Sequence, residues 1–204
     1  MRDHLMKDFG RTSPVGDLML ERLIDGNKRY AAGKLTHPNQ AFRRWVGPAE
    51  RQQPFAVIIS CSESTTPPEV IFDCGVGDLF VVRVAGLVLS ELVLASVEFA
   101  VRTWHIPVVV VLGHSHCSAV ASALRGEDPP SPFGSLATRL RPALERSRRL
   151  PGDAVANGGR AQAQVAAEYM RGAIQTLAGE GGADRLRILA AFFNQGSGMV
   201  EVLD

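Results

Sequence analysis

Cysteine and histidine residues in this chain follow two short apolar runs, and both residue types can bind a metal ion. Cys61 comes directly after the run Phe55–Ser60, and the sequence GHSHC at 113–117 comes directly after Pro107–Leu112. Thiolate sulfur and imidazole nitrogen are ligands that zinc favours in tetrahedral geometry. If water takes the fourth position, the cation lowers the pKa of that water toward about 7 and creates a hydroxide nucleophile. If a carboxylate takes that position, the site is closed.

The elements that would bring these residues together alternate between strands and helices. We expect strands at 55–60, 78–84, 107–112, 185–193 and 199–203, and helices at 90–104, from about 118, at 136–148 and along a long segment that carries Val165, Tyr169, Met170, Ala173 and Leu177 on one face. This alternation predicts an α/β fold with a mostly parallel β-sheet flanked by helices. In such sheets ligands bind at the carboxyl ends of the strands, where Cys61 and the 113–117 sequence would lie. A free cysteine is also common as a small buried hydrophobic residue, so Cys61 alone does not decide between these interpretations.

The first 54 residues are expected to lie outside this sheet. Apolar residues alternate with charged ones from Pro14 to Tyr30 and predict an amphipathic helix. Residues 34–54 are rich in turn formers and are expected to cross the surface. We therefore expect an N-terminal helical arm and surface-crossing segment over 1–54 and an α/β zinc-binding domain over 55–204, which together form one domain.

Composition excludes several classes of partner. The chain has 204 residues, 46% of them hydrophobic, which is enough for one sizeable core. Its formal net charge of +1 gives no concentrated positive field for nucleic acid. No apolar run reaches the roughly 18 residues of a membrane span, and the first residues lack the apolar region of a secretory signal, so a cytoplasmic protein is expected. Three cysteines are an odd number, and in a reducing compartment they are better interpreted as metal ligands, nucleophiles or core residues than as disulfides.

Six segments together resemble the β-class carbonic anhydrases, and they cover nearly the whole chain. The segments are LERLIDGNKRYAAG, QQPFAVIISCSES, PPEVIFDCGVGDLFVVRVAG, LASVEFAV, VVVVLGHSHCSAV and GSGMVEVL. The family pattern is Cys-x-Asp-Ser-Arg, then Gly-Asp-Leu-Phe-Val-Val-Arg, then Gly-His-x-x-Cys-Gly. The combination is specific, although His-x-x-Cys alone is a weak signal.

The resemblance implies a zinc ion held by Cys61, His114 and Cys117, and an obligate dimer, or a higher homo-oligomer, whose N-terminal helices extend onto the partner. It also implies a carbonate dehydratase, a zinc lyase whose zinc-bound hydroxide attacks carbon dioxide to give bicarbonate. Two alternatives stay open. One is a related zinc hydrolase that acts on another small electrophile such as carbonyl sulfide, and the other is a catalytically impaired zinc-binding scaffold protein.

The chain departs from the family pattern at a pair of residues that act together. The family's aspartate accepts a hydrogen bond from the zinc-bound water, and its arginine keeps that aspartate off the metal. Here the two positions are Glu63 and Thr65. Threonine offers neither a charge nor a bidentate fork. Glu63 therefore either binds zinc as the fourth ligand, which closes the site, or stays off the metal, held by a backbone amide or by the hydroxyl of Ser64 or Thr65.

Four further positions match residues that contact substrate in the family. Gln52 stands where the family has a glutamine that orients bicarbonate from the neighbouring subunit. Phe80, Ala85 and Phe99 match a small apolar pocket beside the zinc. For each of these residues, an ordinary surface or core role is an open alternative.

Three remaining residues lie near the motifs. His116 is either a proton carrier or a solvent-exposed histidine. Cys74 is predicted to be an inert buried thiol rather than a metal ligand. Ser118 replaces the glycine that usually follows the second cysteine ligand in the family.

Overall fold

A five-stranded sheet forms the centre of the computed structural model, which describes residues 14–36, 38, 52–127, 135–177 and 186–203. The strand order is β2-β1-β3-β4-β5. The strands are β1 (Ala56–Ser60), β2 (Leu79–Arg83), β3 (Val108–His114), β4 (Arg187–Asn194) and β5 (Met199–Val202). Strands β1 to β4 run parallel to one another, and β5 pairs antiparallel with β4. The predicted α/β fold with a mostly parallel sheet is confirmed.

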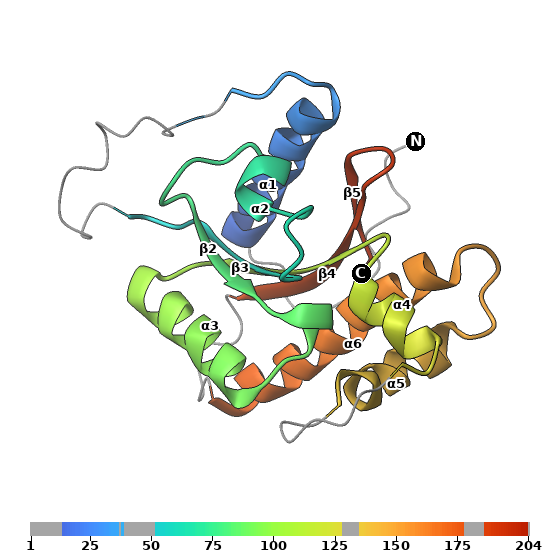
Figure 1. Ribbon diagram of the computed structural model, residues 1–204. Coiled ribbons are helices and arrows are strands. Elements are labelled where there is room, and N and C mark those ends of the chain that lie inside the picture. Colours follow the sequence, from blue (N-terminus) through green and yellow to red (C-terminus); the bar gives the residue numbers. More distant parts are fainter. Residues whose placement is uncertain (1–13, 37, 39–51, 128–134, 178–185, 204) are drawn as a thin grey trace.

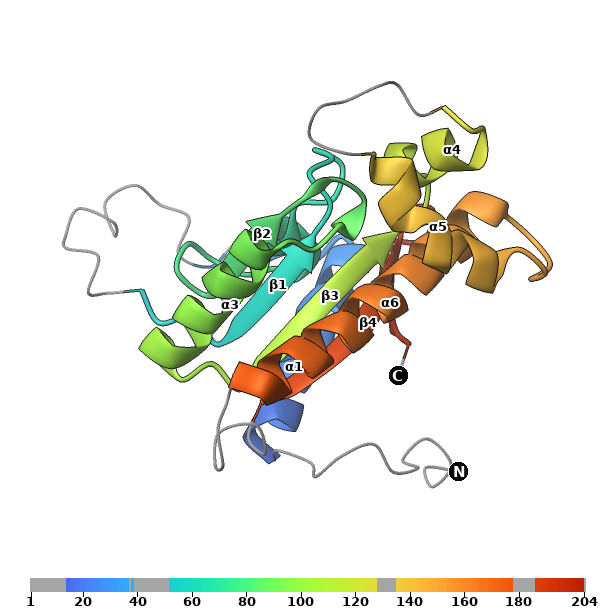
Figure 2. The same ribbon diagram turned by 90° about the horizontal axis from the view of Figure 1, so that it is seen from below.

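Helices cover both faces of the sheet. One face carries α1 (Pro14–Ala31) and the short α2 (Pro68–Ile71), and the other carries α3 (Glu91–Trp104) and α6 (Ala154–Leu177) (Figure 1). Two further helices, α4 (Ser118–Leu124) and α5 (Leu136–Ser147), lie beyond the carboxyl end of β3 (Figure 2). A single turn of 3-10 helix, η3 (Ala85–Leu87), follows β2. Within the described residues, no helix is both long and apolar enough to cross a bilayer.

The hydrophobic core lies in two layers because alternate strand residues point to opposite faces. In β1, Ile58 packs in the cluster beneath α1 and α2, while Val57 and Ile59 pack in the cluster that includes α3 and α6. All five residues of β1 and all seven of β3 are buried. Burial on both faces explains the nearly continuous apolar runs from which these strands were predicted.

A buried polar network fixes α1 on the sheet. Asn27, with none of its surface exposed, donates to the carbonyl oxygens of Ile71 (3.3 Å) and Gly198 (2.9 Å) and accepts from the Val200 N–H (2.7 Å). One residue earlier, a side chain on Gly26 would place its Cβ 1.8 Å from the Phe72 carbonyl oxygen, so only glycine fits. The described part of the N-terminal arm therefore packs against the sheet of its own chain.

Two details differ from the sequence predictions. Tyr169 is 53% exposed whereas the adjacent Met170 is fully buried, so the expected apolar face of α6 was wrong at Tyr169. Neither α2 nor η3 was predicted, because each is a single turn too short to show a period. The boundary at residue 54 stays a prediction, and most of the predicted surface-crossing segment lies outside the described residues.

Candidate metal centre

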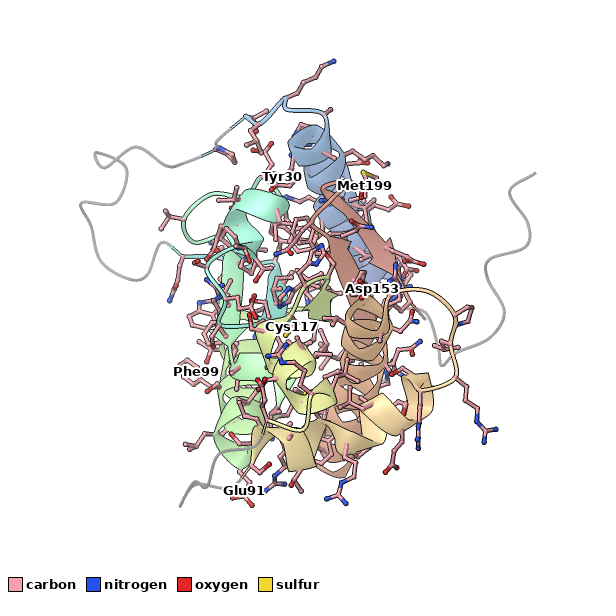
Figure 3. All side chains as sticks on the ribbon, turned by 45° about the vertical axis from the view of Figure 1, so that its right-hand side comes forward. Tyr30, Glu91, Phe99, Cys117, Asp153 and Met199 are labelled. Carbon is pink, nitrogen blue, oxygen red and sulfur yellow. The ribbon has the colours of Figure 1, made fainter. Side chains whose placement is uncertain are left out.

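Four potential ligands meet at the carboxyl ends of β1 and β3. Cys61 follows the last residue of β1, His114 is the last residue of β3, and Cys117 precedes the first residue of α4. One ligand atom from each of these residues and one carboxylate oxygen of Glu63 all lie within 4.8 Å of one another. The two cysteines and the histidine are at most 3% exposed, and Figure 3 places Cys117 in the middle of the molecule at the base of α4. The structure thus brings together the three residues expected to bind zinc.

The strand register explains this meeting. Ser60 of β1 pairs with Leu112 of β3, so the residues that follow the two strands emerge side by side. Close packing of α6 closes the site from one face of the sheet. A Cβ on Gly113 would lie 2.6 Å from the Gly159 carbonyl oxygen, and a Cβ on Gly159 would lie 2.8 Å from the His114 carbonyl oxygen. These two glycines let α6 approach the end of β3.

The His114 ring is oriented as a metal ligand would be. Its Nδ1 lies 2.8 Å from the carbonyl oxygen of Ser115, and because a carbonyl only accepts, Nδ1 carries the proton. Its Nε2 then exposes a lone pair toward the site, and this atom is buried without a hydrogen-bond partner in the described residues. An unpaired buried polar atom is costly and is rare in native proteins. The donor set of two sulfurs and this nitrogen fits a zinc ion.

The two cysteines share a proton unequally. A hydrogen bond from Cys117 to the Cys61 sulfur lowers the pKa of Cys61, with smaller contributions from His114 and from the backbone N–H groups of Glu63 and Gly86. The same contact and burial raise the pKa of Cys117. Burial lowers the pKa of His114, but its contacts with Cys61 and Ser115 outweigh burial and raise it overall. The contacts around Cys61 thus favour its thiolate form over that of Cys117.

One oxygen of the Glu63 carboxylate accepts from a backbone amide, and a Glu63 carboxylate oxygen also lies within 4.8 Å of the three candidate ligand atoms, so both arrangements considered from the sequence stay open. The Ser118 N–H donates to Glu63 Oε1 at 2.6 Å. The backbone of this loop is fixed separately by Arg83 of β2. Its Nε donates to the Cys61 carbonyl oxygen at 2.9 Å, and its Nη2 donates to the Glu63 carbonyl oxygen. Arg83 thus orients the loop, and Ser118 orients the carboxylate.

Thr65 is tied to a turn from the far end of the chain. The Gln195 side chain donates to Thr65 Oγ1 at 2.8 Å, and the Gln195 backbone N–H donates to Ser115 Oγ at 2.9 Å. The turn between β4 and β5 therefore braces both loops that carry the candidate ligands. Sequence reasoning missed Gln195 because no pattern connects a glutamine near the C-terminus to a loop 130 residues earlier.

The positions of the four residues predicted to contact substrate do not by themselves assign them that role. Phe80 and Phe99 both contact Trp104, with ring centroids 5.8 and 5.6 Å away. Phe99 is 57% exposed and points outward from α3 (Figure 3). Ala85 begins η3, and Gln52 is half-buried ahead of β1. Their contacts with substrate stay predictions.

A small cavity of about 10 Å³ lies beside the candidate ligands, which is close to the least volume that holds one water molecule. It is lined by Cys61, Gly86, Leu87, Gly113, His114, Cys117, Val120, Gly159 and Gln162. None of the four predicted substrate residues is in this lining.

His116 and Cys74 lie in contrasting environments. His116 is exposed and has a left-handed backbone conformation, with φ of 57°. Cys74 is 4% exposed, which confirms the predicted burial. Burial, followed by the charge of Asp78, raises the pKa of Cys74 to about 12. All three cysteines of the chain are free.

Comparisons with known proteins relate the sequence and the fold of this chain to one family. A sequence model of the carbonic anhydrase family matches residues 56–200. Carbonic anhydrase 2 of Mycobacterium tuberculosis is 42% identical over 142 residues, which are 68% of this chain and 68% of that protein. Carbonic anhydrase of Mycolicibacterium smegmatis is 40% identical over 131 residues, 62% of this chain and 64% of that protein. The crystal structure of the β-carbonic anhydrase CafA of Aspergillus fumigatus superposes with a TM-score of 0.64 at 27% identity, covering 75% of this chain and 76% of that one.

Proposed function

Because this chain belongs to the β-class carbonic anhydrase family, we propose that it catalyses the reversible hydration of carbon dioxide to bicarbonate with a zinc ion held by Cys61, His114 and Cys117. The enzyme is then a carbonate dehydratase of the lyase class. The observation that carries the proposal is the unpaired buried Nε2 of His114, which shares a 4.8 Å cluster with two buried sulfurs. When zinc is bound in such a site, it lowers the pKa of a water molecule to about 7 and so supplies a nucleophile at neutral pH.

Glu63 is the carboxylate that orients the attacking water in this proposal. Its Oε1 accepts from the Ser118 N–H, which would leave its second oxygen to accept a hydrogen bond from the attacking water. The family's arginine is replaced by Thr65, which bonds to Gln195 instead of to the carboxylate. Ser118 therefore takes over the task of restraining the carboxylate, and Arg83 takes over the task of fixing the loop.

The proposed assembly is a homodimer or a higher homo-oligomer in the cytoplasm. Within the described part of the chain, the edge strand β2 pairs with β1 alone, and the adjacent α3 exposes Leu92 (80%) and Phe99 (57%). An edge strand beside exposed apolar side chains is a surface that another chain can cover. Gln52, Phe80, Ala85 and Phe99 would then contact carbon dioxide or bicarbonate at the subunit boundary. Three free cysteines support a reducing compartment.

The test combines metal analysis with stopped-flow hydration of carbon dioxide. Wild-type protein is expected to contain one zinc per chain and to hydrate carbon dioxide. Glu63→Gln keeps the acceptor for the Ser118 N–H but loses the charge, so kcat/KM is expected to fall about 100-fold while zinc content is unchanged. Glu168→Gln, which removes an exposed carboxylate from α6, is the matched control and should leave both values unchanged.

Assays and a double variant separate the alternatives. Full zinc occupancy without hydration above background would identify a scaffold protein, and turnover of carbonyl sulfide in place of carbon dioxide would identify a related hydrolase. Glu63→Asp combined with Thr65→Arg restores the family pair. A large gain in rate would show that the native pair is impaired, whereas no gain would support Ser118 as an independent way to hold the carboxylate.

A further inference from the structure

We propose that Gln162 is a positioning residue for the metal centre, because its side-chain amide fixes the η3 turn and this turn holds the Gly86 N–H against the Cys61 sulfur. The inference deepens the proposed zinc site and rests on it. Gln162 lies on α6, far from the motifs that define the ligands, and no sequence pattern pointed to it.

The surroundings of Gln162 are unusual for an amide side chain. The residue is 5% exposed, and its Nε2 donates to the Leu87 carbonyl oxygen at 3.1 Å. Its Oε1 is buried and has no hydrogen-bond partner among the described residues. Leaving one buried acceptor unpaired costs about 1–3 kcal/mol, which is comparable to or larger than the gain from one hydrogen bond. Stability of the fold alone therefore does not explain an amide at this position.

The turn that Gln162 contacts has a strained backbone. Gly86 has φ of 60° and Leu87 has φ of 55°, and the second value is unfavourable for a residue with a side chain. The turn is also confined, because a Cβ on Gly86 would lie 3.2 Å from the Ala119 side chain. A donor on the Leu87 carbonyl opposes relaxation of this conformation. Gln162 supplies that donor from α6.

The strained turn acts directly on a candidate ligand. The Gly86 N–H is one of the backbone donors to the Cys61 sulfur, so the position of this turn bears on the position of that ligand atom. Gln162, Gly86 and Leu87 line the same small cavity as Cys61, His114 and Cys117. Partners of this kind orient metal ligands and tune the bond between ligand and metal. Loss of the Gln162 amide should therefore shift Leu87 and Gly86, and through them alter how Cys61 binds the metal.

The same helix offers a matched control. Gln164 also donates its side-chain amide to a backbone carbonyl, that of Leu203, at 3.4 Å. It is half-buried and does not line the cavity. Substitution of either glutamine by methionine keeps an unbranched side chain of similar length and removes the amide. Only the change at position 162 should alter the metal centre.

The first experiment measures release of zinc to a chromophoric chelator. Gln162→Met is expected to release zinc about 10-fold faster than wild type, as loss of a residue that supports a ligand typically does, and Gln164→Met is expected to release it at the wild-type rate. In the cobalt-substituted proteins, the thiolate-to-cobalt charge-transfer band should shift in Gln162→Met alone. Equal release rates and equal spectra in the two variants would overturn the proposal.

A second measurement needs no variant and covers the case in which Gln162→Met does not fold. In wild-type protein loaded with cadmium-113, a hydrogen bond from the Gly86 N–H to the Cys61 sulfur is expected to give a scalar coupling between the Gly86 amide proton and the metal. If the metal binds and this coupling is absent, the inference is wrong but the zinc site stands. If the protein binds no stoichiometric metal, the proposed function fails and the inference fails with it.

Discussion

Asn27 beneath α1 and His114 at the end of β3 are both buried polar side chains, with exposed fractions of 0% and 2%. Every polar atom of the Asn27 side chain has a protein partner, because the amide donates to Ile71 and Gly198 and its oxygen accepts from Val200. The His114 ring has a partner for Nδ1 only, and its Nε2 is unpaired in the described residues. The polar atoms of Asn27 are thus all paired within the chain, whereas His114 Nε2 is free to bind a metal ion.

The unpaired atoms are concentrated in one region. The buried side-chain atoms that lack a partner in the described residues are Ser60 Oγ, His114 Nε2 and Gln162 Oε1. Ser60 directly precedes Cys61, and the other two residues line the cavity beside the candidate ligands. The layer under α1 shows that this chain can satisfy buried polar groups. The unpaired atoms at the carboxyl ends of β1 and β3 therefore mark a functional region.

The largest effect that would sharpen this contrast comes from His114→Ala. Removing a ligand should cost more than the 10–100-fold loss typical of a supporting residue, so zinc affinity is expected to fall by more than about 100-fold. Hydration of carbon dioxide should fall with it. The metal-free variant should be less stable than metal-free wild type by about 2 kcal/mol, because truncation of the buried ring leaves a cavity whose cost is partly offset by removal of the unpaired Nε2. Chelator competition and urea unfolding in the presence of chelator measure the two quantities.

The control for this prediction is His105→Asn. His105 is exposed and ends α3 with a left-handed φ of 52°, a conformation that asparagine tolerates. This variant should keep wild-type zinc affinity and wild-type stability. Full zinc affinity in His114→Ala would break the contrast between the two regions and remove the central support for the metal centre.

The sequence was sufficient to predict the fold and the meeting of the three candidate ligands, for a physical reason. Continuous apolar runs identify strands buried on both faces, and parallel strands end at one edge, so Cys61 and His114 could be placed together from local information. Cys117 follows because it lies only three residues beyond His114. The sequence indicated that a backbone amide could hold the Glu63 carboxylate, but it did not indicate which one. The donor is the Ser118 N–H, 55 residues away along the chain.

The supporting residues could not be predicted because they depend on packing across the chain. Gln162 reaches Leu87 across 75 residues, and Gln195 reaches Thr65 across 130. A glutamine in a helix or a turn is usually a surface residue, so neither position carries a signal in its own neighbourhood. The single turns α2 and η3 are similarly set by tertiary contacts rather than by a period.

The next largest effect tests the polar network around Asn27 beneath α1. Asn27→Leu keeps the number of side-chain heavy atoms and the branch at Cγ but leaves the Ile71 and Gly198 carbonyl oxygens and the Val200 N–H without their partner. We expect the free energy of unfolding to fall by about 3 kcal/mol, since buried groups left unpaired cost about 1–3 kcal/mol each and some will reach water. The folded fraction should bind zinc with wild-type stoichiometry. A loss below 1 kcal/mol, or a loss of zinc from folded protein, would show that the two regions are not independent.

The smallest effect concerns Cys74, the thiol on the α1 side of the sheet. Its pKa is raised from 9.0 to about 12, first by burial and then by Asp78, so the folded protein keeps the thiol protonated where the unfolded chain loses the proton. The stability from this difference is present below pH 9 and is lost progressively as pH rises toward 12. Cys74→Ala should therefore cost about 1 kcal/mol at pH 7, from lost packing, without changing zinc content. Between pH 8 and 10 the wild type should lose about 1 kcal/mol more than the variant, as urea unfolding at each pH would measure. Parallel pH profiles for the two proteins would mean that Cys74 ionises alike in the folded and unfolded states. Water would then reach the layer under α1 more easily than the fully paired network around Asn27 implies.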